Sequence, residues 1–74
     1  MGITEDDLDI SEHAAEMMLE RGISPSEIIR VIQRGAKIRQ NGKYLSIFAK
    51  IRVAHRIMLS GKIRIITVML DDEM

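Results

Sequence analysis

The sequence predicts an α+β fold in which an N-terminal two-helix hairpin packs on a three- or four-stranded antiparallel sheet. Cap residues followed by glycine occur twice before residue 36, which is typical of two short helices. The second half is rich in β-branched residues, and Asn41-Gly42 and Ser60-Gly61 interrupt it as turn signals. The chain has 74 residues, so we expect 1–74 to form a single domain, with residues 1–8 as a loose N-terminal segment.

The first helix is expected to begin near Asp9 or Ser11, because both residue types are good N-caps. Gly22 follows Arg21 and predicts the end of this helix in a left-handed turn. Residues at helical spacing form one apolar face: Ala14, Ala15, Met18 and Leu19.

The second helix has the clearer start. Ser24-Pro25-Ser26-Glu27 is a capping box with proline at the first helical position, and Gly35 ends the segment. Its predicted inward face consists of Ile28, Ile29, Val31 and Ile32.

The predicted strands are Lys37–Arg39, Tyr44–Phe48, Val53–Leu59 and Lys62–Leu70. The stretch from Ala49 to Arg52 lacks a turn residue; we favour a tight bend there over one long, bulged strand. The last strand is apolar on both faces, so we expect it to be central or to be covered by a second copy in a homodimer.

Composition excludes several classes of protein. There is no cysteine, which rules out disulfides and cysteine-based zinc or redox chemistry. No apolar run approaches the roughly 18 residues of a membrane helix, and the acidic N-terminus is unlike a signal peptide. We therefore expect a cytoplasmic protein with no membrane association. Large nucleotide-binding folds are excluded by length.

Charge is strongly segregated although the net charge is zero. Residues 1–27 hold eight acids and one base, whereas residues 28–70 hold ten bases and no acid. The basic segment could present a surface to RNA phosphates. Alternatively, the acidic segment neutralises it within the chain or between two chains. One tyrosine and one phenylalanine are too few for a base-stacking platform.

Two groups of residues could carry chemistry. His13 shares one side of the first helix with Met17 and Arg21 and could act as a general acid or base, or be an ordinary surface histidine. Arg52 and Arg56 alternate with His55, which we expect in the core. Cations of neighbouring strands could join the two arginines in a phosphate-binding cluster (Arg39, Lys50 and Arg64), or the face is merely solvated. No metal site and no cofactor are expected.

Residues 11–24, Ser-Glu-His-Ala-Ala-Glu-Met-Met-Leu-Glu-Arg-Gly-Ile-Ser, resemble the signature of the domain-of-unknown-function 4258 family, and Ile66-Thr67-Val68 resembles its C-terminal end. This resemblance covers residues 9 to 70. It implies a RelE/BrnT-like fold, metal-independent RNA cleavage and a cognate antitoxin as partner. His13, Arg21 and Thr67 match the pattern by position, whereas Met17 stands where the pattern has an arginine.

Two functions therefore remain open. One is RNA binding or metal-independent ribonuclease activity of the toxin type, with His13, Arg21 and Thr67 as catalytic residues. Phosphate would be held by Lys50, Arg52, Arg56 and Arg64. The other is a non-catalytic interaction module that forms a homodimer.

Overall fold

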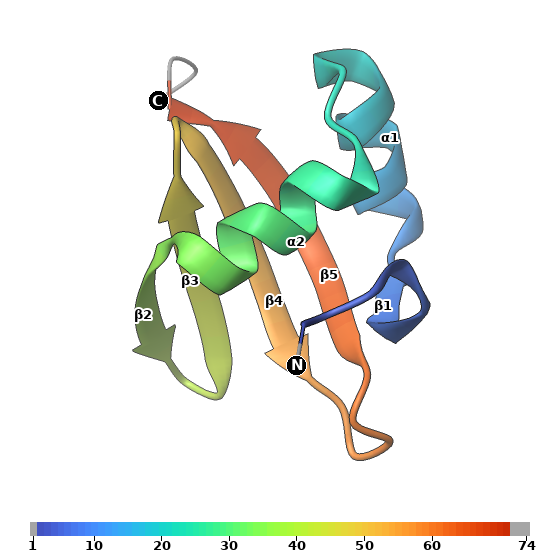
Figure 1. The fold of residues 1–74 in the computed structure, drawn as a ribbon, viewed down its shortest axis with the longest axis vertical. Helices are drawn as coiled ribbons and strands as arrows, with labels where there is room; N and C mark the ends of the chain where they lie inside the picture. Colours follow the sequence, from blue (N-terminus) through green and yellow to red (C-terminus); the bar gives the residue numbers. More distant parts are fainter. Residues whose placement is uncertain (1, 72–74) are drawn as a thin grey trace.

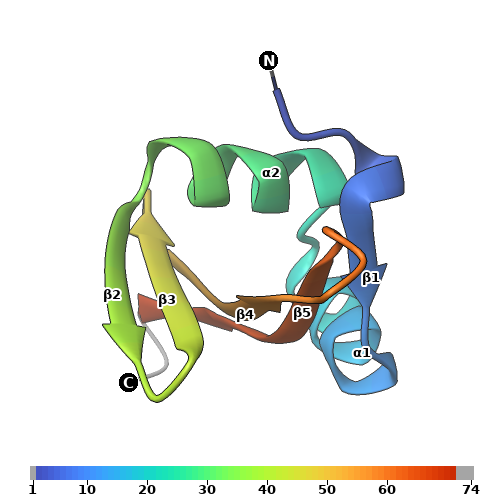
Figure 2. The same cartoon turned by 90° about the horizontal axis from the view of Figure 1, so that it is seen from below.

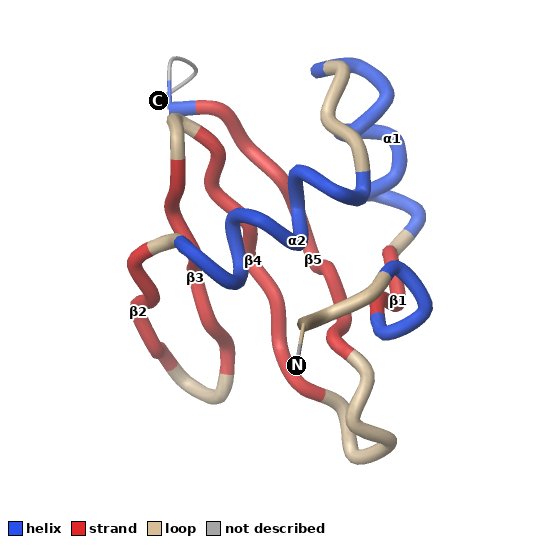
Figure 3. The backbone as a smooth tube through the Cα atoms, viewed as in Figure 1, coloured by secondary structure: helices blue, strands red, loops and turns tan. Residues whose placement is uncertain are grey.

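Two helices and a five-stranded sheet make up the described part of the chain, residues 2–71, in a computed structural model (Figure 1). A 3₁₀ turn, η1 (Glu5–Asp7), precedes β1 (Leu8–Ile10). The remaining elements are α1 (Glu12–Arg21), α2 (Pro25–Arg34), β2 (Ala36–Gln40), β3 (Lys43–Phe48), β4 (Ile51–Ile57) and β5 (Ile63–Leu70). The strand order is β1-β5-β4-β3-β2, parallel between β1 and β5 and antiparallel elsewhere (Figure 3). The α+β class and the two helices are confirmed.

Strand β1 corrects the predicted sheet, which had three or four strands and was wholly antiparallel. Leu8 and Ile10 flank Asp9 and pair with Ile63 and Ile65 of β5. Within the segment expected to be loose, residues 1–8, Glu5–Asp7 form a 3₁₀ turn and Leu8 begins β1, while Met1 lies outside the described residues. A strand of three residues is shorter than the runs that predict strands. Its partner also lies more than fifty residues further along the chain, so no local signal reveals the pairing.

Helix α1 begins after Ser11, whose side chain accepts a hydrogen bond from the Ala14 N–H at 3.1 Å, and ends at Gly22 with φ 67°. The alternative start at Asp9 is wrong because that residue lies in β1. Only part of the predicted apolar face is buried. Ala14 and Met18 reach the core, whereas Leu19 is 85% exposed, because α1 lies at one end of the sheet beside β5.

Helix α2 has the predicted start. The Glu27 N–H donates to Ser24 Oγ at 3.3 Å, and the Ser24 N–H donates to Glu27 Oε1 at 3.1 Å. Ile28, Val31 and Ile32 are buried where the helix crosses one face of the sheet (Figure 2). We call this covered face the inner face and the opposite one the outer face.

Gly35 joins α2 to β2 at a point where the backbone of α2 lies close to that of β3. A Cβ atom at this position would lie 2.6 Å from the Ile47 carbonyl oxygen and closer still to that of Val31. The glycine therefore lets α2 pack tightly on β3, which brings the helix over the sheet.

Three tight turns connect the antiparallel strands. Asn41 and Gly42 both have positive φ, as expected for an Asn-Gly hairpin turn. Ala49 and Lys50 also have positive φ, so the predicted bend is confirmed, although neither residue type favours this conformation. Strand β4 begins and ends two residues earlier than predicted. The Ser60-Gly61 turn is confirmed with φ 91° at Gly61.

Strand β5 has neighbours on both sides, which confirms the expected position inside the sheet. Ile63, Ile65 and Val68 point to the inner face and are buried. The ladder with β4 shifts between Ala54↔Thr67 and His55↔Ile65, so Ile66 is the extra residue of a β-bulge. No helix within residues 2–71 is long and apolar enough to cross a membrane.

Candidate functional site

The outer face carries most of the predicted phosphate-binding residues. Along β4, buried Ile51, Val53 and His55 alternate with the outward Arg52, Ala54 and Arg56. Near the end of β4, Arg56 pairs with Arg64 on β5. Near the start of β4, Arg52 pairs with Met69. The strand alternation thus places Arg52, Arg56 and Arg64 on one face, while Lys50 lies in the turn before β4. Arg39, a candidate addition to this cluster, pairs with Tyr44 and belongs to the inner side.

A short row of cations crosses three strands of the outer face. The β3–β4 ladder ends at the pair Tyr44↔His55, and Lys43 and Arg56 are the residues directly beyond this pair on the two strands. Arg56 in turn pairs with Arg64. We call Lys43, Arg56 and Arg64 the basic row. Lys43 was absent from the predicted cluster, although the Asn41-Gly42 turn fixes its position in the hairpin.

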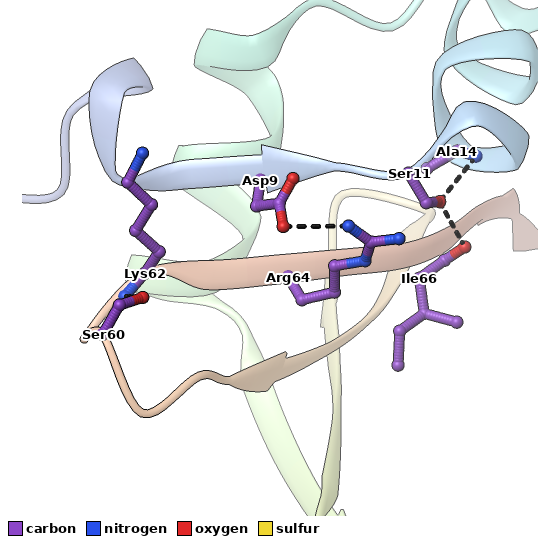
Figure 4. A network of polar contacts seen from close by, with 7 residues as sticks. All are labelled: Asp9, Ser11, Ala14, Ser60, Lys62, Arg64 and Ile66. Carbon is purple, nitrogen blue, oxygen red and sulfur yellow. Dashed lines mark hydrogen bonds and ion pairs between the residues drawn. The ribbon is translucent and has the colours of Figure 1, made fainter.

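One end of the basic row is neutralised by the acidic N-terminal segment. Arg64 Nη1 donates to Asp9 Oδ2 at 2.8 Å, because the parallel pairing of β1 and β5 sets Asp9 beside Arg64 (Figure 4). Both side chains are more than a third exposed, at 41% and 35%. A pair this exposed adds under about 1 kcal/mol to stability, so a phosphate group could compete with the carboxylate.

Arg52 lies apart from the basic row and also has an acidic partner. Its Nε donates to Asp71, which directly follows β5. The Asp71 N–H donates to the Lys50 carbonyl oxygen at 2.8 Å and holds this carboxylate near the turn. Arg56 and Lys43 have no carboxylate partner within residues 2–71. The uncompensated positive charge of this face therefore lies on β3 and β4, at the end of the sheet where Lys43 begins β3 and Arg56 precedes the end of β4.

The start of α1 is fastened to the bulge of β5. The Ser11 N–H donates to the Ile65 carbonyl oxygen at 3.1 Å, and Ser11 Oγ donates to that of Ile66 at 3.1 Å (Figure 4). Thr67 follows the bulge, and His13 is the second residue of α1. His13 thus lies two residues, and Thr67 one residue, from the Ser11–Ile66 contact that joins α1 to β5.

His13 is exposed and takes part in no hydrogen bond or ion pair within the described chain. Arg21 lies eight residues further, ~12 Å along the helix axis. Its guanidinium turns back toward His13, since Nη1 lies 2.9 Å from Met17 Sδ and 3.5 Å from Glu20 Oε2. The side chain of Arg21 therefore approaches the position where the family pattern has its other arginine.

The inner face holds a polar cluster that sequence reasoning identified only in part. His55 is 3% exposed, which confirms its expected place in the core, and its Nε2 lies 2.9 Å from Ser46 Oγ. Its ring stacks on Tyr44 with centroids 5.7 Å apart. Burial and the nearby Lys37 ammonium lower the pKa of His55 from 6.5 to about 4, so the ring is neutral at pH 7. Ser46 could not be matched to His55 before the β3–β4 register was known.

No three histidine, aspartate or glutamate side chains between residues 2 and 71 gather so that they could hold a metal ion. The outer face and the start of α1 present cations and one exposed imidazole. Such groups can bind phosphate and transfer protons.

Comparison with known proteins adds two findings. The sequence pattern of a family described as Domain of unknown function (DUF4258) matches residues 10–70. Among solved structures, the fold is similar to a chain in the crystal structure of the toxin–antitoxin complex RelBE2 from Mycobacterium tuberculosis. That match has a TM-score of 0.62 and 13% identity and covers 95% of this chain and 99% of the other. A search of curated proteins finds no match.

Proposed function

Because the chain belongs to the DUF4258 family, whose function is unknown, we propose a function from its geometry: the outer face binds cytoplasmic RNA, and His13 takes part in cleaving it. The basic row is the observation that carries this proposal. Its three cations stand on adjacent strands ~4.8 Å apart, so neighbouring phosphates of one RNA strand could bind together. The RelBE2-like fold agrees with a toxin-type protein.

In this proposal His13 acts as general base or acid toward a ribose 2′-hydroxyl and its adjacent phosphate. Thr67, next to the contact of α1 with β5, would orient the phosphate. Arg21, whose Nη1 lies 2.9 Å from Met17 Sδ one helical turn from His13, would help to hold this phosphate. Arg52 and Arg56 would offset charge that develops during cleavage, and no metal ion is needed for these steps.

Binding is tested with a short single-stranded RNA at increasing salt. Each phosphate contact makes the slope of log K against log salt more negative by ~0.7, so Arg52→Ala with Arg56→Ala, which removes two contacts, should make the slope shallower by ~1.4. Arg30→Ala with Arg34→Ala removes the same charge from α2 on the other side of the sheet and serves as the control. Equal slopes for the two double variants would contradict the proposed face.

Cleavage is tested separately from binding. His13→Ala should abolish turnover and leave RNA affinity nearly unchanged, because a proton-transfer group acts mainly in the transition state. Met17→Arg restores the cation of the family pattern one helical turn from His13 and should raise the cleavage rate. Cleavage that persists in His13→Ala would remove this residue from the mechanism.

A second candidate function is supported by the apolar centre of the outer face. Ile38 is 52% exposed and pairs with Leu45, which pairs with Ala54, so an apolar row runs beside the basic row. This row could be covered by a second copy of the chain or by an antitoxin. Light scattering distinguishes the homodimer, since it should report twice the chain mass of 8.4 kDa. A dimer that binds no RNA at low salt would favour the interaction module.

A further inference from the structure

A cavity of about 230 Å³ lies on the inner face, on the side of the sheet away from the basic row. Four isoleucines from separate elements form its apolar walls: Ile3 of the N-terminal segment, Ile32 of α2, Ile57 of β4 and Ile63 of β5. Its polar lining comes from Lys37, Tyr44 and His55. Apolar cavities of about 150 Å³ hold a benzene-sized molecule, so this one has room for such a group and a small polar head.

His55 lines this cavity and has one ring nitrogen without a hydrogen-bond partner in the described chain. Nε2 is engaged by Ser46, whereas Nδ1 is buried and has no partner in the described chain. A buried polar atom without a partner destabilises the folded chain, and a bound ligand atom could supply the missing hydrogen bond. When the Ser46 hydroxyl donates to Nε2, the neutral ring carries its proton on Nδ1 and offers a donor.

Lys37 adds a positive charge without a counter-ion. It pairs with Ser46 across the β2–β3 ladder, lines the cavity and has no carboxylate partner within residues 2–71. No aspartate or glutamate is among the residues that line the cavity. Tyr44, stacked on His55 and covered by the Arg39 guanidinium at 5.9 Å, holds the imidazole ring in place.

We propose that this cavity binds a small monocarboxylate with an apolar tail of about six carbons. The carboxylate would bind between the Lys37 ammonium and the His55 Nδ1–H, and the tail would lie among the four isoleucines. The Lys37 ammonium favours an anion, and the four isoleucines favour an apolar tail. The His55 Nδ1–H, as the one buried donor of the described lining residues, favours a compact acceptor such as a carboxylate. This site is independent of the proposed RNA-binding face.

Calorimetric titration with hexanoate and benzoate tests the proposal. Eight or nine heavy atoms correspond to a Kd of about 1 mM. Three control compounds should bind at least tenfold more weakly. Hexylamine carries a positive charge, hexanol carries no charge, and acetate has no apolar tail. Binding should also shift the ¹⁵N resonance of His55 Nδ1. Equal affinity for hexanol, or for inorganic phosphate, would overturn the proposal, as would no binding of either acid.

Lys37→Met keeps an unbranched apolar side chain and removes the charge. Because Lys37 lies in β2, whose residues are all exposed, the substitution should not disturb folding. It should weaken carboxylate binding at least tenfold, whereas Lys43→Met, on the outer face, should not. Arg52→Ala with Arg56→Ala should bind hexanoate like the parent. Failure of RNA binding would therefore leave this proposal standing, and an unchanged affinity in Lys37→Met would overturn it.

Discussion

Acidification below pH 6.5 should destabilise the protein through His55. In the folded chain the ring is buried beside Ser46 and Tyr44, and burial together with Lys37 lowers its pKa from 6.5 to about 4. In the unfolded chain the same ring binds a proton near pH 6.5. Because the folded pKa is depressed, the stabilisation is complete above pH 6.5 and is lost as the pH falls toward 4.

The magnitude follows from the shift. Each pKa unit corresponds to about 1.4 kcal/mol, so the full loss reaches about 3 kcal/mol near pH 4. Between pH 7.5 and pH 5.5 the free energy of unfolding should fall by about 1.4 kcal/mol. For a chain of 74 residues this lowers the melting temperature by about 5–10 °C.

Urea denaturation followed by circular dichroism at pH 7.5, 6.5 and 5.5 measures this loss. His55→Gln retains a side chain that can hydrogen-bond Ser46 but does not titrate, so its stability should change little over this range. The control is His13→Gln, since His13 is exposed and its removal should leave the pH dependence of the parent intact. A parent that is equally stable at pH 7.5 and 5.5 would refute the reasoning, and so would an undiminished loss in His55→Gln.

Three further predictions concern stability. Ser24→Ala removes the capping box of α2 and should lower the free energy of unfolding by about 1 kcal/mol in a denaturant titration. Ala49→Asn with Lys50→Gly introduces the Asn-Gly sequence of the 41–42 turn and should raise the free energy of unfolding by about 1 kcal/mol. The control Lys62→Gly, at a residue without positive φ, should not raise it. Gly35→Ala should lower the melting temperature by at least 5 °C or so, since its Cβ would meet backbone on both sides. Gly2→Ala, where only the end of a flexible glutamine is near, should melt like the parent.

Features that depend on a few neighbouring residues were predictable. Both helices follow from their caps, and the Ser24 box and Gly22 lie where the sequence places them. The Asn41-Gly42 turn fixes the β2–β3 hairpin. Alternation along β4 correctly separates buried His55 from the outward arginines. In each case the interactions that decide the conformation lie within about four residues of each other.

Features that depend on register between distant segments were not predictable. Leu8–Ile10 forms a strand only because it pairs with β5, which lies far away in the sequence. The exposure of Leu19 depends on where α1 contacts the sheet. The bulge at Ile66 shifts the ladder by one residue and thereby decides which residues of β5 face outward. The cavity beside His55 likewise requires α2, strands β2 to β5 and the N-terminal segment to meet.

The segregation of charge along the sequence allowed two interpretations, a basic surface for RNA and neutralisation by the acidic segment. The topology is consistent with both, in different parts of the outer face. Because β1 is parallel to β5, Asp9 from the acidic segment lies beside Arg64. Because Asp71 directly follows β5, it reaches Arg52 at the other end of β4. Internal neutralisation therefore acts at the two ends of the outer face, where the acidic stretches of the chain adjoin the sheet. Arg56 lies in the same cross-strand row as Arg64 and Asp9 but one strand further into the sheet, and it has no carboxylate partner within residues 2–71, so positive charge remains on the middle strands of the face. The same acids that make the net charge zero thus confine the basic surface to one row, which is why net charge alone is a poor guide to whether this protein binds a polyanion.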